Sequence, residues 1–132
     1  MTYLLDTNIV SDLVRNPAGR AAVRLAAIGE VRPCTSIVVA AELQYGAIRR
    51  GSQRLTRQLE IVLSAIDVLP LDQPADLRYA ELRVHLERND LAIGPNDFFI
   101  AAHALSLDCT LVTGNEREFA RVPGLKIENW LR

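Results

Sequence analysis

Short apolar runs alternate along this chain with longer segments in which apolar residues recur every three or four positions. The runs cover about residues 2–5, 31–35, 67–71, 109–113 and 125–130. Their length suits strands that are buried on both faces, whereas the recurrence between them is typical of helices with one buried side. Strands that alternate with helices form a parallel sheet covered by helices. The sequence therefore predicts an α/β fold with a central, mostly parallel sheet flanked by helices on both faces.

Length and composition favour one compact domain, residues 1–132, because 132 residues with 49% hydrophobic side chains suffice for one core. The apolar start of the chain is interrupted at Asp6, too early for a secretory signal, and no later apolar run is long enough to span a bilayer. We therefore expect a cytoplasmic protein without a membrane segment. Cys34 and Cys109 lie within apolar runs and are expected to be reduced core thiols.

Three helical segments carry predictions about their starts and their buried sides. Asn16 and Pro17 have the form of a helix N-cap followed by a first-turn proline. Ser36 is expected to cap a helix that continues to Arg50. Its predicted buried face contains Val38, Ala41, Tyr45 and Ile48, and that of a later helix, ending near Arg88, contains Leu77 and Val84.

Oxygen-bearing side chains stand where the predicted strands end. Asp6 follows the first strand, and Asn115 closely follows the strand that ends at Thr113. Ligands of open parallel sheets bind just beyond the carboxyl ends of the strands. Asp97 begins a helix, where the helix dipole favours a carboxylate, and Glu42 lies on a helix that also follows a strand. These four residues are the candidate site.

Each of these residues also has an ordinary interpretation as a turn residue, a helix cap or a solvated acid. The neighbours of Glu42 and Asp97 favour a functional role, because both residues lie in strongly apolar segments where an unpaired charge is costly. A bound cation would remove that cost. Carboxylate oxygens suit Mg²⁺, with Mn²⁺ as a substitute, and such ions accept phosphate oxygens at their open positions. The expected substrate is therefore a phosphate ester.

The sequence lacks the residues that several other chemistries require. His85 and His103 have no ligand-like spacing to the cysteines, so zinc is not indicated, and each histidine is interpreted as a helix residue. The chain has no Gly-rich phosphate loop ending in Gly-Lys-Ser/Thr, no G-x-G-x-x-G and no G-x-S-x-G. A formal net charge of −1 argues against coating nucleic acid through bulk positive charge. Any contact with phosphate must be local.

Four segments and the end of the chain together resemble VapC-type PIN-domain toxins. The matching segments, in order, are LLDTNIV from Leu4, AEL from Ala41, GPNDFFIAAHA from Gly94, LVTGNEREF from Leu111 and PGLKIENW from Pro123. They occur in the family's order, and together they cover essentially the whole chain.

This resemblance implies a PIN-like domain that acts as a magnesium-dependent endoribonuclease and cleaves RNA, often transfer RNA. It also implies neutralisation by a cognate VapB-type antitoxin, binding of operator DNA only through that antitoxin, and a homodimer. Asp6, Glu42 and Asp97 match the family's acidic triad, and the fourth acidic position falls on Asn115. Thr7, Asn8 and Thr113 match polar positions that would orient the carboxylates, although Asn8 is equally interpretable as a helix cap.

Several alternatives stay open at this point. Glu118 is another candidate for the fourth position, but we expect it to be solvated. A cluster of Arg49, Arg50, Arg54 and Arg57 is interpretable as an RNA backbone contact or as a solvated helix end. The segment after Asp6 faintly resembles the motif of aspartate-nucleophile phosphatases, although Asn8 replaces the second aspartate and the sole lysine, Lys126, lies in the predicted terminal strand. A catalytically silent PIN-fold binding module is the alternative from another class.

Overall fold

The computed structural model describes residues 2–132, so the first residue of the expected domain lies outside the described part. The strands are β1 (Tyr3–Leu5), β2 (Cys34–Ser36), β3 (Asp67–Leu69), β4 (Thr110–Val112) and β5 (Lys126–Glu128). The helices are α1 (Thr7–Arg15), α2 (Arg20–Ala27), α3 (Ile37–Arg50), α4 (Gln53–Ser64), α5 (Ala75–Arg88), α6 (Pro95–Ser106) and α7 (Glu116–Phe119). All neighbouring strands are parallel, in the order β3-β2-β1-β4-β5. The predicted parallel α/β arrangement is confirmed.

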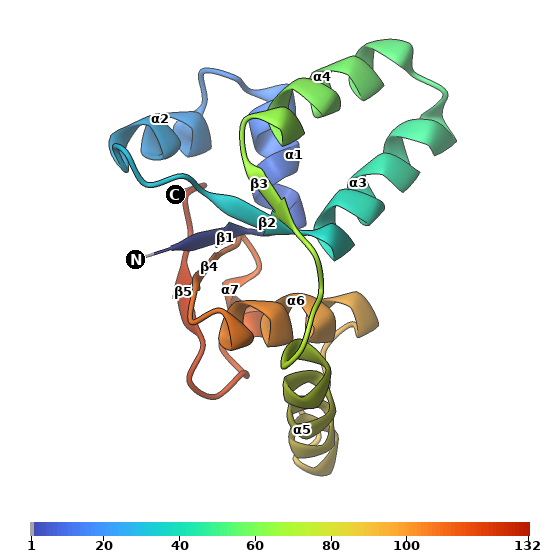
Figure 1. Cartoon of the computed structure of the whole chain (residues 1–132), viewed down its shortest axis with the longest axis vertical. Helices are drawn as coiled ribbons and strands as arrows, with labels where there is room; N and C mark the ends of the chain where they lie inside the picture. The colour runs from blue at the N-terminus through green and yellow to red at the C-terminus, as the bar shows by residue number, and fades with distance from the viewer. Residues whose placement is uncertain (1) are drawn as a thin grey trace.

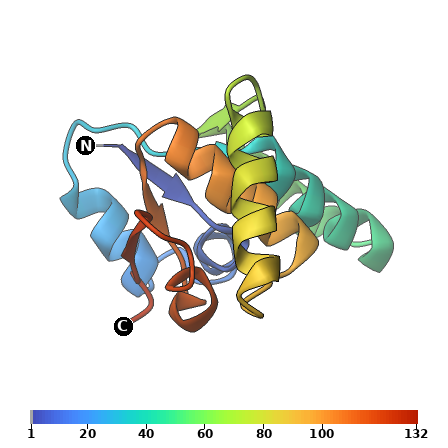
Figure 2. The same cartoon turned by 90° about the horizontal axis from the view of Figure 1, so that it is seen from below.

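The helices form two layers around this sheet. Figure 1 shows α1 to α4 above the strands and α5 to α7 below them, and Figure 2 looks onto α5 and α6 from their own side. Right-handed crossovers explain the division, because connections that run outward in opposite directions from the middle of a parallel sheet place their helices on opposite faces. The chain adds β2 and β3 on one side of β1, and β4 and β5 on the other.

The strand order therefore reverses between β1 and β4, the pair in the middle of the sheet. Leu5 of β1 lies opposite Val112 of β4, so the chain leaves both strands at the same edge. A reversal of this kind opens a crevice at the carboxyl ends of the strands, because the two connections diverge to opposite faces. Asp6 and Thr113 are the first residues beyond β1 and β4.

Large apolar side chains pack the sheet between the two helical layers. Those with essentially no exposed surface include Leu4, Leu5, Phe98, Leu111, Phe119 and Trp130. Burial of one such side chain contributes about 1.5–3 kcal/mol, which makes this cluster the main source of rigidity under the crevice. Cys34 and Cys109 are buried free thiols, as expected. Among residues 2–132, no helix is both long and apolar enough to cross a membrane.

The predicted start of the second helix is wrong. Asn16 closes α1 instead, because its backbone N–H bonds the carbonyl of Asp12 and its side-chain amide donates to Oδ1 of Asp12 at 2.7 Å. Pro17 lies in a turn, and α2 begins after Gly19. The hydrogen bonds between Asn16 and Asp12 thus make Asn16 the end of α1 rather than the start of the next helix, which the Asn-Pro pattern predicts.

The predicted buried face of α3 is right only at Val38, which is half-buried against the core, and the predicted face of α5 is wrong. Tyr45 and Ile48 of α3 are 64% and 74% exposed, whereas Val39, Ala40 and Ala47 are buried. Short side chains let a helix axis approach its neighbours closely, so the alanine-rich side packs inward. On α5 the exposed residues are Leu77 and Val84, and the buried ones are Ala75, Leu82 and Leu86.

Candidate functional site

Asp6 lies at the strand-order reversal with only 4% of its surface exposed. It is the N-cap of α1, and its Oδ1 accepts a 2.7 Å hydrogen bond from the backbone N–H of Thr7. Its Oδ2 accepts a second 2.7 Å bond from the hydroxyl of Thr113. Burial raises the pKa of Asp6 above its ordinary value, the two hydrogen bonds oppose that rise, and repulsion from Glu42 adds to it.

Glu42 reaches the same place from α3. The hydroxyl of Thr7 donates to its Oε1 at 2.9 Å, so Thr7 bridges Asp6 and Glu42 with its backbone N–H and its side chain. The side chain of Glu42 is half-buried. Thr7 and Thr113 therefore do hydrogen-bond to carboxylates, as the resemblance implied.

Asp97 stands in the first turn of α6 and belongs to the same cluster of negative charge. Burial raises its pKa to about 7, helped by a hydrogen bond with Glu118 and by repulsion from Glu118, Asp6 and Glu42. Burial and neighbouring negative charges both disfavour the charged form of a carboxyl group, and a bound cation would favour it.

Glu118 lies inside this cluster, and our expectation of a solvated Glu118 is wrong. Its Oε1 accepts a 2.8 Å bond from the backbone N–H of Gly94, and its Oε2 accepts from the side-chain amide of Asn115. Gly94 allows the close approach, since a Cβ there would lie 3.2 Å from Oδ2 of Asp97. The spacing of Asn115 and Glu118 on a short helix was the signal in the sequence, because residues three apart share a helix face.

Asn115, on which the family's fourth acidic position falls, is exposed and its amide donates to Glu118. Its backbone N–H donates to the hydroxyl of Thr113 at 3.0 Å, so Thr113 connects this loop to Asp6. Asn8 is not a helix cap, since Asp6 occupies that position. Oδ1 of Asn8 instead accepts from the backbone N–H of Gly114 at 3.0 Å and ties α1 to the same loop.

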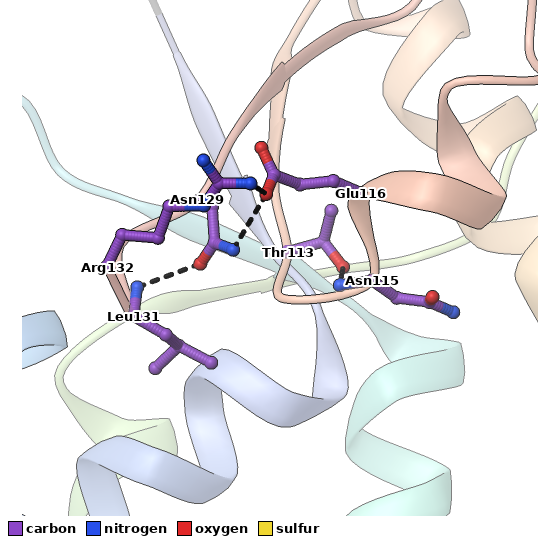
Figure 3. A network of polar contacts seen from close by, with 6 residues as sticks. All are labelled: Thr113, Asn115, Glu116, Asn129, Leu131 and Arg132. Carbon is purple, nitrogen blue, oxygen red and sulfur yellow. Dashed lines mark hydrogen bonds and ion pairs between the residues drawn. The ribbon is translucent and has the colours of Figure 1, made fainter.

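The last residues of the chain, 129–132, support this loop through hydrogen bonds. Figure 3 shows Asn129 between two partners: its Oδ1 accepts from the backbone N–H of Leu131 at 2.9 Å, and its amide donates to Oε2 of Glu116 at 3.1 Å. Arg132 also donates to Glu116. Glu116 immediately follows Asn115, so the bracing acts directly on the loop that carries the site.

The donor set fits a hard divalent cation. Asp6, Glu42, Asp97 and Glu118 offer only carboxylate oxygens, and their mutual repulsion is what a cation would relieve. Within residues 2–132, however, no three acidic, histidine or cysteine side chains stand close enough to form a closed metal site. The carboxylates are therefore neighbours that do not form a closed coordination shell.

A groove opens beside Glu42 between α1, α3 and α4. It encloses about 190 Å³ and is lined by Ser11, Val14, Arg15, Glu42, Leu43, Gly46, Ala47, Arg50, Leu55 and Leu59. Its floor is mostly apolar, and two arginines and one glutamate contribute to its lining. Such a surface suits a peptide segment better than a small polar metabolite.

Lys126 lies far from the carboxylates, which weakens the phosphatase alternative. It begins β5 opposite Thr110, the first residue of β4, and its ammonium pairs with Asp108 at 3.2 Å. Because the strands are parallel, this is the edge of the sheet opposite to Asp6. An aspartate nucleophile would need a cation beside its phosphate, and this lysine cannot supply it.

Comparisons with known proteins agree with this architecture. The PIN domain family matches residues 3–125. Ribonuclease VapC2 of Rickettsia felis is 39% identical over 98% of both chains, and the tRNA(fMet)-specific endonuclease VapC of Shigella flexneri is 37% identical over 98% of both. The crystal structure of Rickettsia felis VapBC2 bound to a promoter DNA fragment has a chain that superposes with a TM-score of 0.91 at 36% identity, covering 98% of this chain and 99% of that one.

Proposed function

Because this chain belongs to the PIN-domain family and, within it, to the VapC-type ribonuclease toxins, we propose that it is a magnesium-dependent endoribonuclease. Mn²⁺ is expected to substitute for Mg²⁺. The observation that carries the proposal is geometric: Thr7 bridges Asp6 and Glu42, and Asp97 is hydrogen-bonded to Glu118 in the same cluster.

Asp6, Glu42 and Asp97 are the proposed metal ligands, and Glu118 rather than Asn115 is the proposed fourth carboxylate. Thr7 and Thr113 fix the orientation of Asp6, and Thr7 also fixes Glu42. When bound, the metal supplies Lewis-acid chemistry: it polarises the phosphate and favours deprotonation of an attacking water. Burial of Asp6 limits competition from bulk water for that carboxylate.

RNA is the proposed substrate, and transfer RNA is the class we favour. The Shigella flexneri relative is named as specific for tRNA(fMet), and it aligns with this chain over almost its entire length. The exposed arginines at the end of α3 and the start of α4, namely Arg49, Arg50, Arg54 and Arg57, provide local positive charge on a protein with a formal net charge of −1. Local charge of this kind can hold an RNA backbone.

A VapB-type antitoxin is the proposed partner. Similar solved chains come from VapBC complexes of Rickettsia felis and Haemophilus influenzae. The apolar groove beside Glu42 is a suitable seat for the antitoxin's tail, and an arginine of that tail would pair with the carboxylates. Operator DNA would be bound only through the antitoxin. We also propose that the toxin is a cytoplasmic homodimer built from one domain per chain.

RNA cleavage by the purified protein tests this proposal. Cleavage should require Mg²⁺ or Mn²⁺, stop in excess EDTA and be abolished by Asp97→Asn, which keeps the shape of the side chain but removes its charge. Asp76→Asn is the matched control, because Asp76 is an exposed aspartate in the first turn of α5. Undiminished cleavage in EDTA, or full activity of folded Asp97→Asn, would overturn the proposal.

A further inference from the structure

A buried histidine and a buried serine join the two helices that carry Glu42 and Asp97. Nδ1 of His103, on α6, lies 2.8 Å from Oγ of Ser36, the residue that precedes α3. His103 is 2% exposed and Ser36 is fully buried. Figure 1 shows the start of α3 next to α6, and the two helices are in contact.

The hydroxyl group of Ser36 takes part in two hydrogen bonds. Oγ of Ser36 accepts from the backbone N–H of Val38 at 3.1 Å and so caps α3. The oxygen could accept a second bond as well, so two directions fit the 2.8 Å contact; in the arrangement proposed below, the hydroxyl donates to Nδ1 of a neutral imidazole. The ring also interacts with the backbone of Pro70, just beyond β3. Burial lowers the pKa of His103, which keeps the ring neutral.

Ser36 also lies next to Asp6 at the edge of the sheet. Leu5 of β1 is paired with Thr35 of β2, so Asp6 and Ser36 are the next residues on the two neighbouring strands. The hydroxyl of Thr35 donates to the carbonyl of Leu5 at 2.6 Å, which fixes this register in the core. Ser36 and His103 thus lie on or next to the segments that carry three carboxylates, namely Asp6, Glu42 and Asp97.

We propose that Ser36 and His103 are positioning residues that set the spacing of Glu42 and Asp97 around the metal. A shift of α3 along α6 would break the buried hydrogen bond between Oγ of Ser36 and Nδ1 of His103, and that loss resists the shift. The inference rests on the proposed function, because the spacing matters only if the carboxylates share a cation. Neither residue is assigned a contact with substrate.

The alternative is that the pair only stabilises the fold, and the chain offers a matched control for that case. Ser52 caps α4 in the same way, with its Oγ accepting from the backbone N–H of Leu55 at 3.1 Å. Its hydroxyl has no histidine partner in the part of the chain that the structure describes. Ser52→Ala therefore removes a serine cap without removing a link between α3 and α6.

The test compares Ser36→Ala, His103→Leu, the double variant and Ser52→Ala by Tm, by calorimetric Mn²⁺ titration without RNA, and by kcat and KM for RNA. We expect Ser36→Ala and His103→Leu each to weaken Mn²⁺ binding about fivefold, and the double variant to lose little more than either, because one link is being removed. kcat should fall while KM stays nearly constant. Ser52→Ala should lower Tm and leave Mn²⁺ affinity unchanged.

His103→Asn keeps an acceptor near the position of Nδ1 and should restore part of the Mn²⁺ affinity lost in His103→Leu. If His103→Leu does not fold, ¹⁵N NMR of the wild-type imidazole still tests the pair, and a proton on Nδ1 at neutral pH would overturn it. Unchanged Mn²⁺ affinity in folded Ser36→Ala, and in His103→Leu where that variant folds, together with active wild type, would overturn the positioning role alone. Wild-type protein that neither binds Mn²⁺ nor cleaves RNA would overturn the proposed function and, with it, this role.

Discussion

The hydroxyl of Thr113 donates a 2.7 Å hydrogen bond to Oδ2 of Asp6, although 107 positions separate the two residues in the chain. The bond crosses the strand-order reversal, joining the residue after β4 to the residue after β1. The same hydroxyl accepts from the backbone N–H of Asn115 at 3.0 Å. One fully buried threonine thus couples the most buried carboxylate to the loop that leads to Glu118.

Thr113→Val should therefore weaken both the fold and the site. The valine keeps the volume but removes a donor to Asp6 and an acceptor for Asn115, so we expect a loss of about 1–2 kcal/mol in the free energy of unfolding. Mn²⁺ affinity should fall about tenfold, as is typical when a group that orients a ligand is removed. Urea unfolding and calorimetry measure the two effects. Thr113→Ser, which keeps the hydroxyl, is the control and should lie close to wild type in Mn²⁺ affinity.

The raised pKa of Asp97 predicts how the metal-free protein responds to pH. Its folded pKa of about 7 exceeds its ordinary value of 3.8, so the folded state binds the proton more tightly than the unfolded state. The stability from this group is fully present below the ordinary pKa and is lost as the pH rises through about 7. Metal-free wild type should therefore lose stability relative to Asp97→Asn between pH 5 and pH 8.

Thermal melts in EDTA measure that difference, and saturating Mg²⁺ should largely abolish it because the cation stabilises the charged carboxylate. A gap between wild type and Asp97→Asn that is the same at both pH values would contradict the crowded-carboxylate interpretation.

His103 predicts a change of the opposite sign at lower pH. Burial lowers its pKa from the ordinary 6.5, so the folded state resists protonation. Its contribution to stability is fully present above the ordinary pKa and is lost as the pH falls through the folded value. Wild type should therefore lose stability on acidification below about pH 6.5 more steeply than His103→Asn, whose side chain does not titrate. Parallel acid titrations of the two folded proteins, monitored by circular dichroism, would contradict this.

Glu118 and Asn115 make separable predictions because only one of them is a carboxylate. Glu118→Gln should weaken Mn²⁺ binding and cleavage strongly, a larger effect than a solvated side chain would give. Asn115→Asp replaces the amide that donates to Glu118 with a like charge, so metal-free protein should lose stability while Mn²⁺ binds more tightly. Calorimetric Mn²⁺ titration of both variants decides between them. Wild-type affinity in Glu118→Gln would return the fourth position to Asn115.

The sequence predicted the sheet, and it placed Asp6 after a strand and Asp97 at the start of a helix, because each of these signals was local. Asp6 directly follows a short apolar run, and Asp97 directly precedes a long apolar segment. The structure brings Asp6, Glu42 and Asp97 together, and their roles as ligands remain a prediction. The resemblance to a family indicated that these separate segments contribute to one site. Periodicity alone could not indicate this.

What the sequence could not predict depended on tertiary contacts. The helix α3 has apolar residues on more than one side, and periodicity does not say that the alanine-rich side packs inward while Tyr45 is exposed. Glu118 appeared solvated because its partner, the backbone N–H of Gly94, lies 24 positions away in the chain. The Ser36–His103 link is equally non-local, at 67 positions.

Gly46 offers a test of the antitoxin groove in which no carboxylate is substituted. It lies within α3 and lines the groove, and a Cβ at this position would meet no atom within 4 Å. Gly46→Ala should therefore stabilise the toxin by about 0.5–1 kcal/mol, because glycine is an unfavourable residue in a helix interior. Gly46→Leu should fill the groove instead, since its larger side chain enters space that an antitoxin segment would need.

We expect Gly46→Leu to weaken binding of the cognate antitoxin at least tenfold while RNA cleavage by the free toxin stays within about twofold of wild type, because 1.4 kcal/mol of lost contact suffices for a tenfold change. Titration of each toxin with purified antitoxin, with residual cleavage as the readout, measures this. Gly46→Ala is the control and should still be neutralised. If Gly46→Leu folds, cleaves RNA and is neutralised at the wild-type antitoxin concentration, the antitoxin does not use this groove.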